Sequence, residues 1–158
     1  MVDADGASNF SDVEKLWDEM DLVEKNGHAI SVGSRHILLR SVVRNLLMHA
    51  LHFILRTLGV GHVRDTQCGF KLFARNTARA LFPTMHISHW IFDVEILLMA
   101  DILNIPVVEV PVGWHEVPGS KINLVTDSLG MLRDLLILRA NYAVRRWSVP
   151  SRGKSKID

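Results

Sequence analysis

Residues 64–71, with the sequence Arg-Asp-Thr-Gln-Cys-Gly-Phe-Lys, hold the densest group of side chains that could do chemistry. They combine two cations, a carboxylate, a hydroxyl, an amide and a thiol between an apolar helical pattern and a short apolar strand pattern. A plain connector would need only one or two turn residues here. The alternative is a capped loop in which Asp65 and Thr66 satisfy backbone groups. The residues alone leave both interpretations open.

Asp3 and Asp5 form a second candidate site, because two acids one residue apart point the same way in an extended segment and could share a cation. An EF-hand loop is excluded, since Ala7 and Ser8 stand where an oxygen ligand and a glycine are needed. A phosphatase nucleophile loop would need a strand upstream of Asp3. Two interpretations remain: a metal–nucleotide site, and solvated acids before a helix N-terminus.

Two other places could contact a phosphate. Gly33 and Arg35 end an apolar run, where glycine lets the backbone approach a ligand and arginine can form a forked contact. Residues 117–121 form a loop with Lys121 and several backbone donors.

Asp93 and Glu95 fall in the first turn of a predicted helix, where they interact favourably with the helix dipole. If buried beside a nucleotide, these two acids would instead need partners, and their pKa values would shift.

The elements that must position these residues alternate between strand and helix patterns, which predicts an α/β fold. A capping box of Ser11 and Glu14 predicts the start of the first helix. Prolines at positions 106 and 111 suit an edge strand. The predicted strands are residues 28–33, 70–73 and 105–114, and the predicted helices are residues 11–24, 40–58, 76–82, 89–103 and 124–147.

The last predicted helix is amphipathic and basic, with a broad leucine face, several arginines and Trp147 near its end. Such a helix suits a membrane surface, where each Lys or Arg is worth about 1 kcal/mol. A helix packed on the domain, followed by a frayed basic tail, is the alternative.

Composition narrows the classes of function. The formal net charge is +1 at pH 7 and the pI is about 8.0, so whole-chain electrostatics do not indicate nucleic acid. The single cysteine fits a reducing compartment. No signal peptide or spanning segment is visible, since the longest apolar candidate, residues 46–58, is too short. Hydrophobic residues make up 48% of the chain, a surplus that must be buried in a core, against further chain or at a membrane.

Residues 64–73 resemble the signature of the dolichyl-phosphate β-glucosyltransferases of the endoplasmic reticulum. Residues 90–95 and 114–121 resemble other segments of the same family, and the Asp3-Ala4-Asp5-Gly6 and Gly33-Ser34-Arg35 segments fit it in the same order. The resemblance covers nearly the whole chain. It implies an inverting glycosyltransferase of family 2 with a GT-A, Rossmann-like fold. The implied reaction transfers glucose from UDP-glucose to dolichyl phosphate at the cytosolic face of the endoplasmic reticulum membrane.

The same resemblance implies roles for individual residues. Asp3 and Asp5 would hold Mg²⁺ or Mn²⁺ against the UDP diphosphate, and Asp65 and Gln67 would line the sugar pocket as catalytic residues. Donor or acceptor phosphates would meet Arg35, Arg40, Arg44, Lys71, Ser120 and Lys121. A phosphate monoester acceptor is largely dianionic at pH 7 and needs little general-base help. Asp65 is therefore assigned first to orienting the sugar or acceptor, and only second to base catalysis.

Family members carry a membrane-anchoring helix and the first strands of the nucleotide-binding sheet ahead of the Asp-x-Asp motif. Residues 1–123 are therefore expected to be a partial GT-A catalytic domain, and residues 124–158 a membrane-interface helix with a basic tail. We expect this chain alone to be inactive or very weak. Two alternatives remain: a non-catalytic membrane-surface or partner-binding fragment of the same fold, and an enzyme resembling dolichyl-phosphate mannosyltransferase that uses GDP-mannose.

Overall fold

The computed structural model describes residues 1–35, 63, 65–88, 91–115 and 124–149. The predicted helix over residues 40–58 and the predicted loop over residues 117–121 lie outside these ranges. The division predicted after residue 123 also falls at the edge of such a gap. Among the described residues, no helix is both long enough and apolar enough to cross a membrane.

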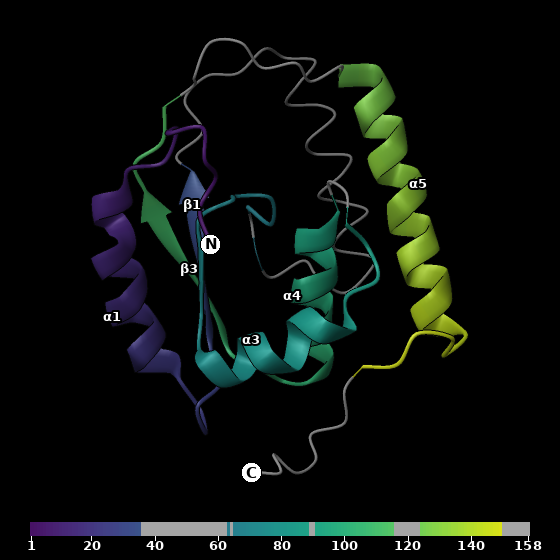
Figure 1. Cartoon of the computed structure of the whole chain (residues 1–158), viewed down its shortest axis with the longest axis horizontal. Coiled ribbons are helices and arrows are strands. Elements are labelled where there is room, and N and C mark those ends of the chain that lie inside the picture. The colour runs from purple at the N-terminus through teal and green to yellow at the C-terminus, as the bar shows by residue number, and fades with distance from the viewer. Residues whose placement is uncertain (36–62, 64, 89–90, 116–123, 150–158) are drawn as a thin grey trace.

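A small mixed sheet forms the centre of the described structure (Figure 1). Its strands are β1 (Ile30–Arg35), β2 (Lys71–Phe73) and β3 (Val107–Val112), in the spatial order β2-β1-β3. β2 runs antiparallel to β1, and β3 runs parallel to it. The predicted α/β class is confirmed, and this sheet fits the C-terminal part of a GT-A fold.

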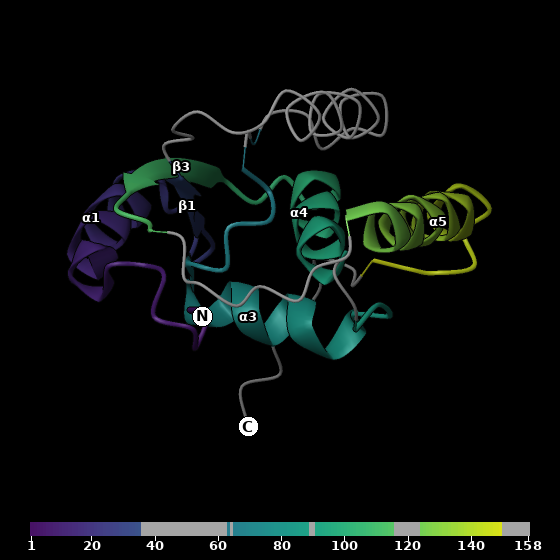
Figure 2. The same ribbon diagram turned by 90° about the horizontal axis from the view of Figure 1, so that it is seen from above.

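Helices cover both faces of the sheet. The described helices are α1 (Val13–Val23), which follows a 3₁₀ turn at Phe10–Asp12, α3 (Arg75–Leu81), which continues into a 3₁₀ turn at Phe82–Thr84, α4 (Phe92–Ile102) and α5 (Leu124–Ala143). α1 lies on one face of the sheet, α4 on the other, and α5 beyond α4 (Figures 1 and 2).

Alternation along β1 explains these layers. Ile30 and Val32 are fully buried in the core that α4 and α5 complete, where α5 contributes Leu135 and Leu138. Ser31 and Gly33 lie on the opposite face, the one that α1 covers, because successive strand residues point to opposite faces. On that side Leu16 of α1 packs against valines of β3. The chain thus buries its apolar residues on both sides of one sheet, as expected when a strand has helices on both faces.

Several boundaries differ from the predictions. β1 runs through Arg35, so the Gly33-Ser34-Arg35 segment belongs to the strand and does not form a turn after it. β3 continues through Pro111, which an edge strand tolerates. The predicted capping box is wrong: the Ser11 hydroxyl donates to Asn9 Oδ1 at 2.6 Å, and Asn9 also accepts from the Ser11 N–H.

The last helix also ends earlier than predicted, at Ala143. Arg145 has a φ of 56°, in the left-handed region, and the chain then turns back. The Trp147 ring stacks on His86 with 4.3 Å between ring centroids. Trp147 therefore packs on the loop before α4 and does not lie on the helix, where the sequence pattern had placed it.

Candidate functional site

An ion pair between Arg35 and Asp65 joins the end of β1 to the central loop, residues 65–70, which precedes β2. Arg35 Nε donates to Asp65 Oδ2 at 2.7 Å, and Nη2 donates to Oδ1 at 2.8 Å. The Arg35 backbone N–H also donates to Oδ2, at 3.0 Å. The side chains of Arg35 and Asp65 are only 22% and 11% exposed. This two-pronged, mostly buried contact fixes the position of both groups, as such arginine–carboxylate pairs do.

Neighbouring elements hold this pair from two further directions. The Asp65 backbone N–H donates to Glu109 Oε1 of β3 at 2.9 Å. The guanidinium of Arg35 lies over the Trp114 ring, 5.6 Å from its centroid. Burial lowers the pKa of Arg35, but the hydrogen bond and charge of Asp65, together with smaller contributions from Cys68 and Asp3, raise that pKa overall, so Arg35 stays a cation. The end of the sheet therefore presents a permanent positive charge beside the Asp65 carboxylate.

A second ion pair, more deeply buried, ties the same loop to α4. Lys71 Nζ lies 2.9 Å from Asp93 Oδ1 and also donates to the Cys68 backbone carbonyl. The Lys71 side chain is 0% exposed. Burial raises the pKa of Asp93, and the charge of Lys71 lowers it in part. Lys71 thus joins the loop to α4. A buried acid at position 93 was expected to need a partner, and that partner is Lys71.

The N-terminal segment brings Asp3 onto the central loop. A Cβ atom added to Gly69 would lie only 2.0 Å from Asp3 Oδ2, so the carboxylate occupies the space that any larger residue would fill. Asp3 also contributes to the pKa of both Arg35 and Asp93 through its charge. Asp3 therefore lies with the two ion pairs in one cluster of charges.

The structure brings together four of the residues predicted for the site: Asp3, Arg35, Asp65 and Lys71. Asp5 accepts a hydrogen bond from the Ala7 N–H at 3.0 Å in its own turn. Gln67 Nε2 contacts Met131 Sδ of α5 at 3.7 Å. Outside the described residues lie Arg40, Arg44, Ser120 and Lys121. The roles given to all of these residues stay predictions.

Glu109, which accepts a hydrogen bond from the Asp65 backbone N–H, was not among the predicted site residues. Its signal was a single carboxylate in an otherwise apolar strand, Val107–Val112.

Burial raises the pKa of the Cys68 thiol, so this cysteine lacks the features of an activated nucleophile.

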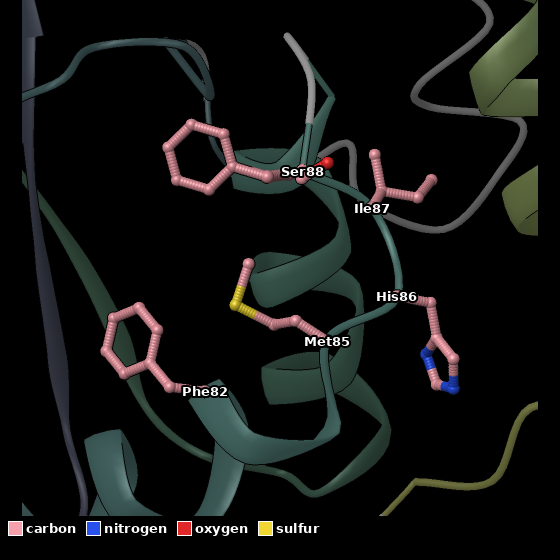
Figure 3. A pocket seen from close by; sticks show the side chains of 6 residues that line it. Phe82, Met85, His86, Ile87 and Ser88 are labelled. Atoms are coloured by element: carbon pink, nitrogen blue, oxygen red, sulfur yellow. The ribbon is translucent and has the colours of Figure 1, made fainter.

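A separate pocket lies beside the start of α4 (Figure 3). Six residues line it: Phe82, Met85, His86, Ile87, Ser88 and Phe92. In Figure 3 the Phe82 and Met85 side chains point to one side of the loop, whereas His86 points to the other, toward the segment after α5.

Comparison with known proteins identifies relatives of the chain. A dolichyl-phosphate β-glucosyltransferase of Dictyostelium discoideum is 47% identical, with the match covering 96% of this chain and 48% of that protein. Proteins of the same name match at 44% identity in Saccharomyces cerevisiae (89% of this chain, 46% of that protein) and at 43% in Homo sapiens (93% and 48%).

The chain thus spans about half the length of the curated relatives it matches. No protein-family model matches the chain, and no solved structure is significantly similar to it. The resemblance seen in its motifs is nevertheless confirmed over most of the sequence: the chain is a homologue of the dolichyl-phosphate β-glucosyltransferases over about half of their length.

Proposed function

We propose that this chain supplies part of a glucosyl-transfer site, in which glucose passes from UDP-glucose to dolichyl phosphate with inversion. The observation that carries the proposal is the convergence of Asp3, Arg35 and Asp65 on one loop. Transfer to a phosphate needs neutralisation and in-line placement of two anions more than it needs a strong base. A fixed guanidinium beside two carboxylates suits that task, and the names of the relatives give the donor sugar and the acceptor.

The residues present fit a divalent cation of the Mg²⁺ or Mn²⁺ type. Among the described residues, no three His, Cys, Asp or Glu side chains gather as a complete metal site. Mg²⁺ at nucleotide sites uses only one or two carboxylates and completes its shell with substrate phosphates and water. Asp3, with Asp5 two residues further on, would provide those carboxylates, and the ion would neutralise the diphosphate leaving group.

A chimaera tests the proposal. This chain replaces the matching part of the Dictyostelium discoideum relative, and transfer of labelled glucose from UDP-glucose to dolichyl phosphate is measured. We expect the chimaera to be active. The Asp3→Ala variant should lose at least about 100-fold in rate, because the ion that would neutralise the diphosphate leaving group loses a carboxylate ligand. Gly69→Ala should lose a comparable factor, since the added Cβ displaces the Asp3 carboxylate.

Gly130→Ala is the matched control, because a Cβ at Gly130 meets no atom within 4 Å. This variant should keep the rate of the parent chimaera. An inactive chimaera that folds would refute the proposed function, and full activity in both Asp3→Ala and Gly69→Ala would remove Asp3 from the site.

We also infer that α5 lies against the cytosolic leaflet of the endoplasmic reticulum membrane. Its outward side carries exposed apolar residues, including Leu129 and Leu136, at 62% and 57% exposure. The exposed side chain of Arg133 lies on the same side of the helix, four residues after Leu129. In Figure 2, α5 forms the outer layer of the described molecule. An amphipathic helix binds a membrane by burying such apolar area and attracting anionic lipids.

Flotation with anionic liposomes tests this placement. We expect Leu136→Glu to reduce the bound fraction several-fold, because it puts a carboxylate into the apolar and lipid-facing side. Leu22→Glu is the control, since Leu22 is 79% exposed on α1, on the other side of the sheet. Equal flotation of the two variants would exclude α5 as the membrane contact.

A further inference from the structure

The guanidinium of Arg35 has a fork of donors that its ion pair with Asp65 does not use. Asp65 accepts from Nε and from Nη2, which together form the side-on fork of the group. A guanidinium is planar and its N–H donors have fixed directions, so Nη1 and the second N–H of Nη2 form an end-on fork that points away from Asp65. Because the two-pronged contact fixes the position of Arg35, it also sets the direction of this end-on fork.

Trp114 holds the guanidinium from a second direction. This residue follows the end of β3 at Val112, and its ring centroid lies 5.6 Å from Arg35 Cζ. An arginine within about 6 Å of the centroid of a tryptophan ring is attracted to the negative face of that ring. A carboxylate on one side and an indole ring on another therefore restrict the guanidinium more than the ion pair alone would.

The position of Trp114 is set in turn by the N-terminal segment. Trp114 forms an isolated antiparallel bridge with Ser8. Beside this bridge, the His115 N–H donates to the Ala7 carbonyl at 3.0 Å, and the Ala7 N–H donates to Asp5 Oδ1 at 3.0 Å. The segment that carries the N-terminal acids thus fixes the backbone from which the indole ring extends to Arg35.

We propose that Trp114 is a positioning residue of the transfer site, whose ring keeps the end-on fork of Arg35 directed at a substrate phosphate. The ring acts through Arg35, by limiting its motion and excluding water from it. The phosphate belongs either to the diphosphate of the donor or to the monoester of the acceptor, which present the same anionic oxygens to a fork. This inference rests on the proposed function, in which Arg35 neutralises one of the two anions.

Steady-state kinetics of the chimaera test this role. We expect Trp114→Leu to raise the KM for one of the two substrates, UDP-glucose or dolichyl phosphate, at least about 10-fold, because leucine lacks the ring face. The KM for the other substrate should stay within about 2-fold, and the affected substrate identifies the phosphate that Arg35 meets. Trp114→Phe should bring the raised KM back to within about 3-fold of the parent value, since phenylalanine keeps an aromatic face.

A matched control and a second variant make this test specific. Trp17→Leu makes the same change at a tryptophan that is 55% exposed on α1, and it should leave both KM values unchanged. Circular dichroism reports whether each variant folds. If Trp114→Leu does not fold, tetrafluorotryptophan at position 114 keeps the shape of the ring but weakens its negative face, so it should raise the same KM. Unchanged KM values in the folded Trp114 variants, or an equal change in Trp17→Leu, would overturn the inference.

A titration that needs no transfer separates this inference from the proposed function. The Arg35 Nε–H signal of this chain alone is followed by NMR during addition of methyl phosphate and, separately, of inorganic pyrophosphate. We expect one probe to shift the signal, with a dissociation constant that rises at least about 5-fold in the folded Trp114 variant.

The KM values decide if the chimaera is active, and the titration decides if it is not. An inactive chimaera together with the expected titration would support the role of Trp114 and count against the proposed function. An inactive chimaera with no shift from either probe would overturn both. An active chimaera whose KM values do not respond to Trp114 would overturn the inference and leave the proposed function in place.

Discussion

Replacing Asp65 with alanine is expected to lower the free energy of unfolding by about 3 kcal/mol and to abolish glucosyl transfer in the chimaera. Asp65 accepts three hydrogen bonds from Arg35, two from the guanidinium and one from the backbone N–H. The variant leaves a guanidinium that is only 22% exposed without its counter-charge. Breaking a buried pair by removing one partner is costly because the remaining charge stays desolvated.

Asp65→Asn separates stability from catalysis. The amide keeps the shape and one acceptor oxygen, so its loss of stability should be smaller than that of the alanine variant. Its transfer rate should still fall at least about 100-fold, because the site loses a charge that orients the sugar or acceptor. Urea unfolding at several concentrations measures the first quantity, and the rate of the chimaera measures the second.

The pair of Arg133 and Asp134 offers a matched control with similar geometry on the surface. Arg133 Nη2 lies 2.8 Å from Asp134 Oδ1, and the Asp134 side chain is 14% exposed, but the Arg133 side chain is 69% exposed and keeps its contact with water when Asp134 is removed. Exposed pairs contribute about 0–1 kcal/mol, so Asp134→Ala should hardly change the unfolding curve. If Asp65→Ala and Asp134→Ala lower the free energy of unfolding by the same amount, burial of the Arg35–Asp65 pair does not add to stability.

Much of the fold could be predicted from local sequence. The apolar run over residues 28–33 predicted β1, and the strand pattern over residues 105–114 predicted β3. The segments predicted as helices over residues 11–24 and 89–103 contain α1 and α4. Boundaries were less accurate where tertiary contacts decide them. The apolar pattern of the last helix continues to Trp147, yet the helix ends at Ala143, and the Trp147 ring stacks on His86 instead. Sequence pattern cannot specify this partner, which lies far away along the chain.

The same distinction holds for the candidate site. The acids and cations near Asp65 were identified by their density, and the pairing of Asp65 with Arg35 agrees with a shared site. Lys71 was predicted to contact a phosphate, whereas in the structure it is buried against Asp93, 22 residues further along the chain. Asp5 caps its own turn through Ala7, a local bond that competes with a ligand role. Spacing shows which residues could meet, but only packing decides the pairs.

Glu95 of α4 is the other position where a substitution should have a large effect. It is fully buried and accepts hydrogen bonds from the backbone N–H groups of His86 and Ile87, at 3.0 and 2.8 Å. The His86 ring nitrogen Nδ1 lies 3.0 Å from the carboxylate, and the Tyr142 hydroxyl donates to it at 3.2 Å. Burial, followed by the charge of Glu95, raises the pKa of Tyr142, so this hydroxyl stays a donor. One carboxylate thus joins α4, the loop before it and the end of α5.

Glu95→Ala should lower the free energy of unfolding by about 4 kcal/mol, because it removes the buried acceptor of two backbone N–H groups and of the half-buried Tyr142 hydroxyl. Glu95→Gln should cost less, since the amide keeps one acceptor oxygen for the same donors. Glu14→Ala on the exposed first turn of α1 is the control, expected to change stability by less than about 1 kcal/mol. Chemical unfolding of the three variants measures this order. Equal stability of Glu95→Ala and Glu14→Ala would show that water replaces the carboxylate at no cost, and the junction of α4 and α5 would then depend on its apolar contacts alone.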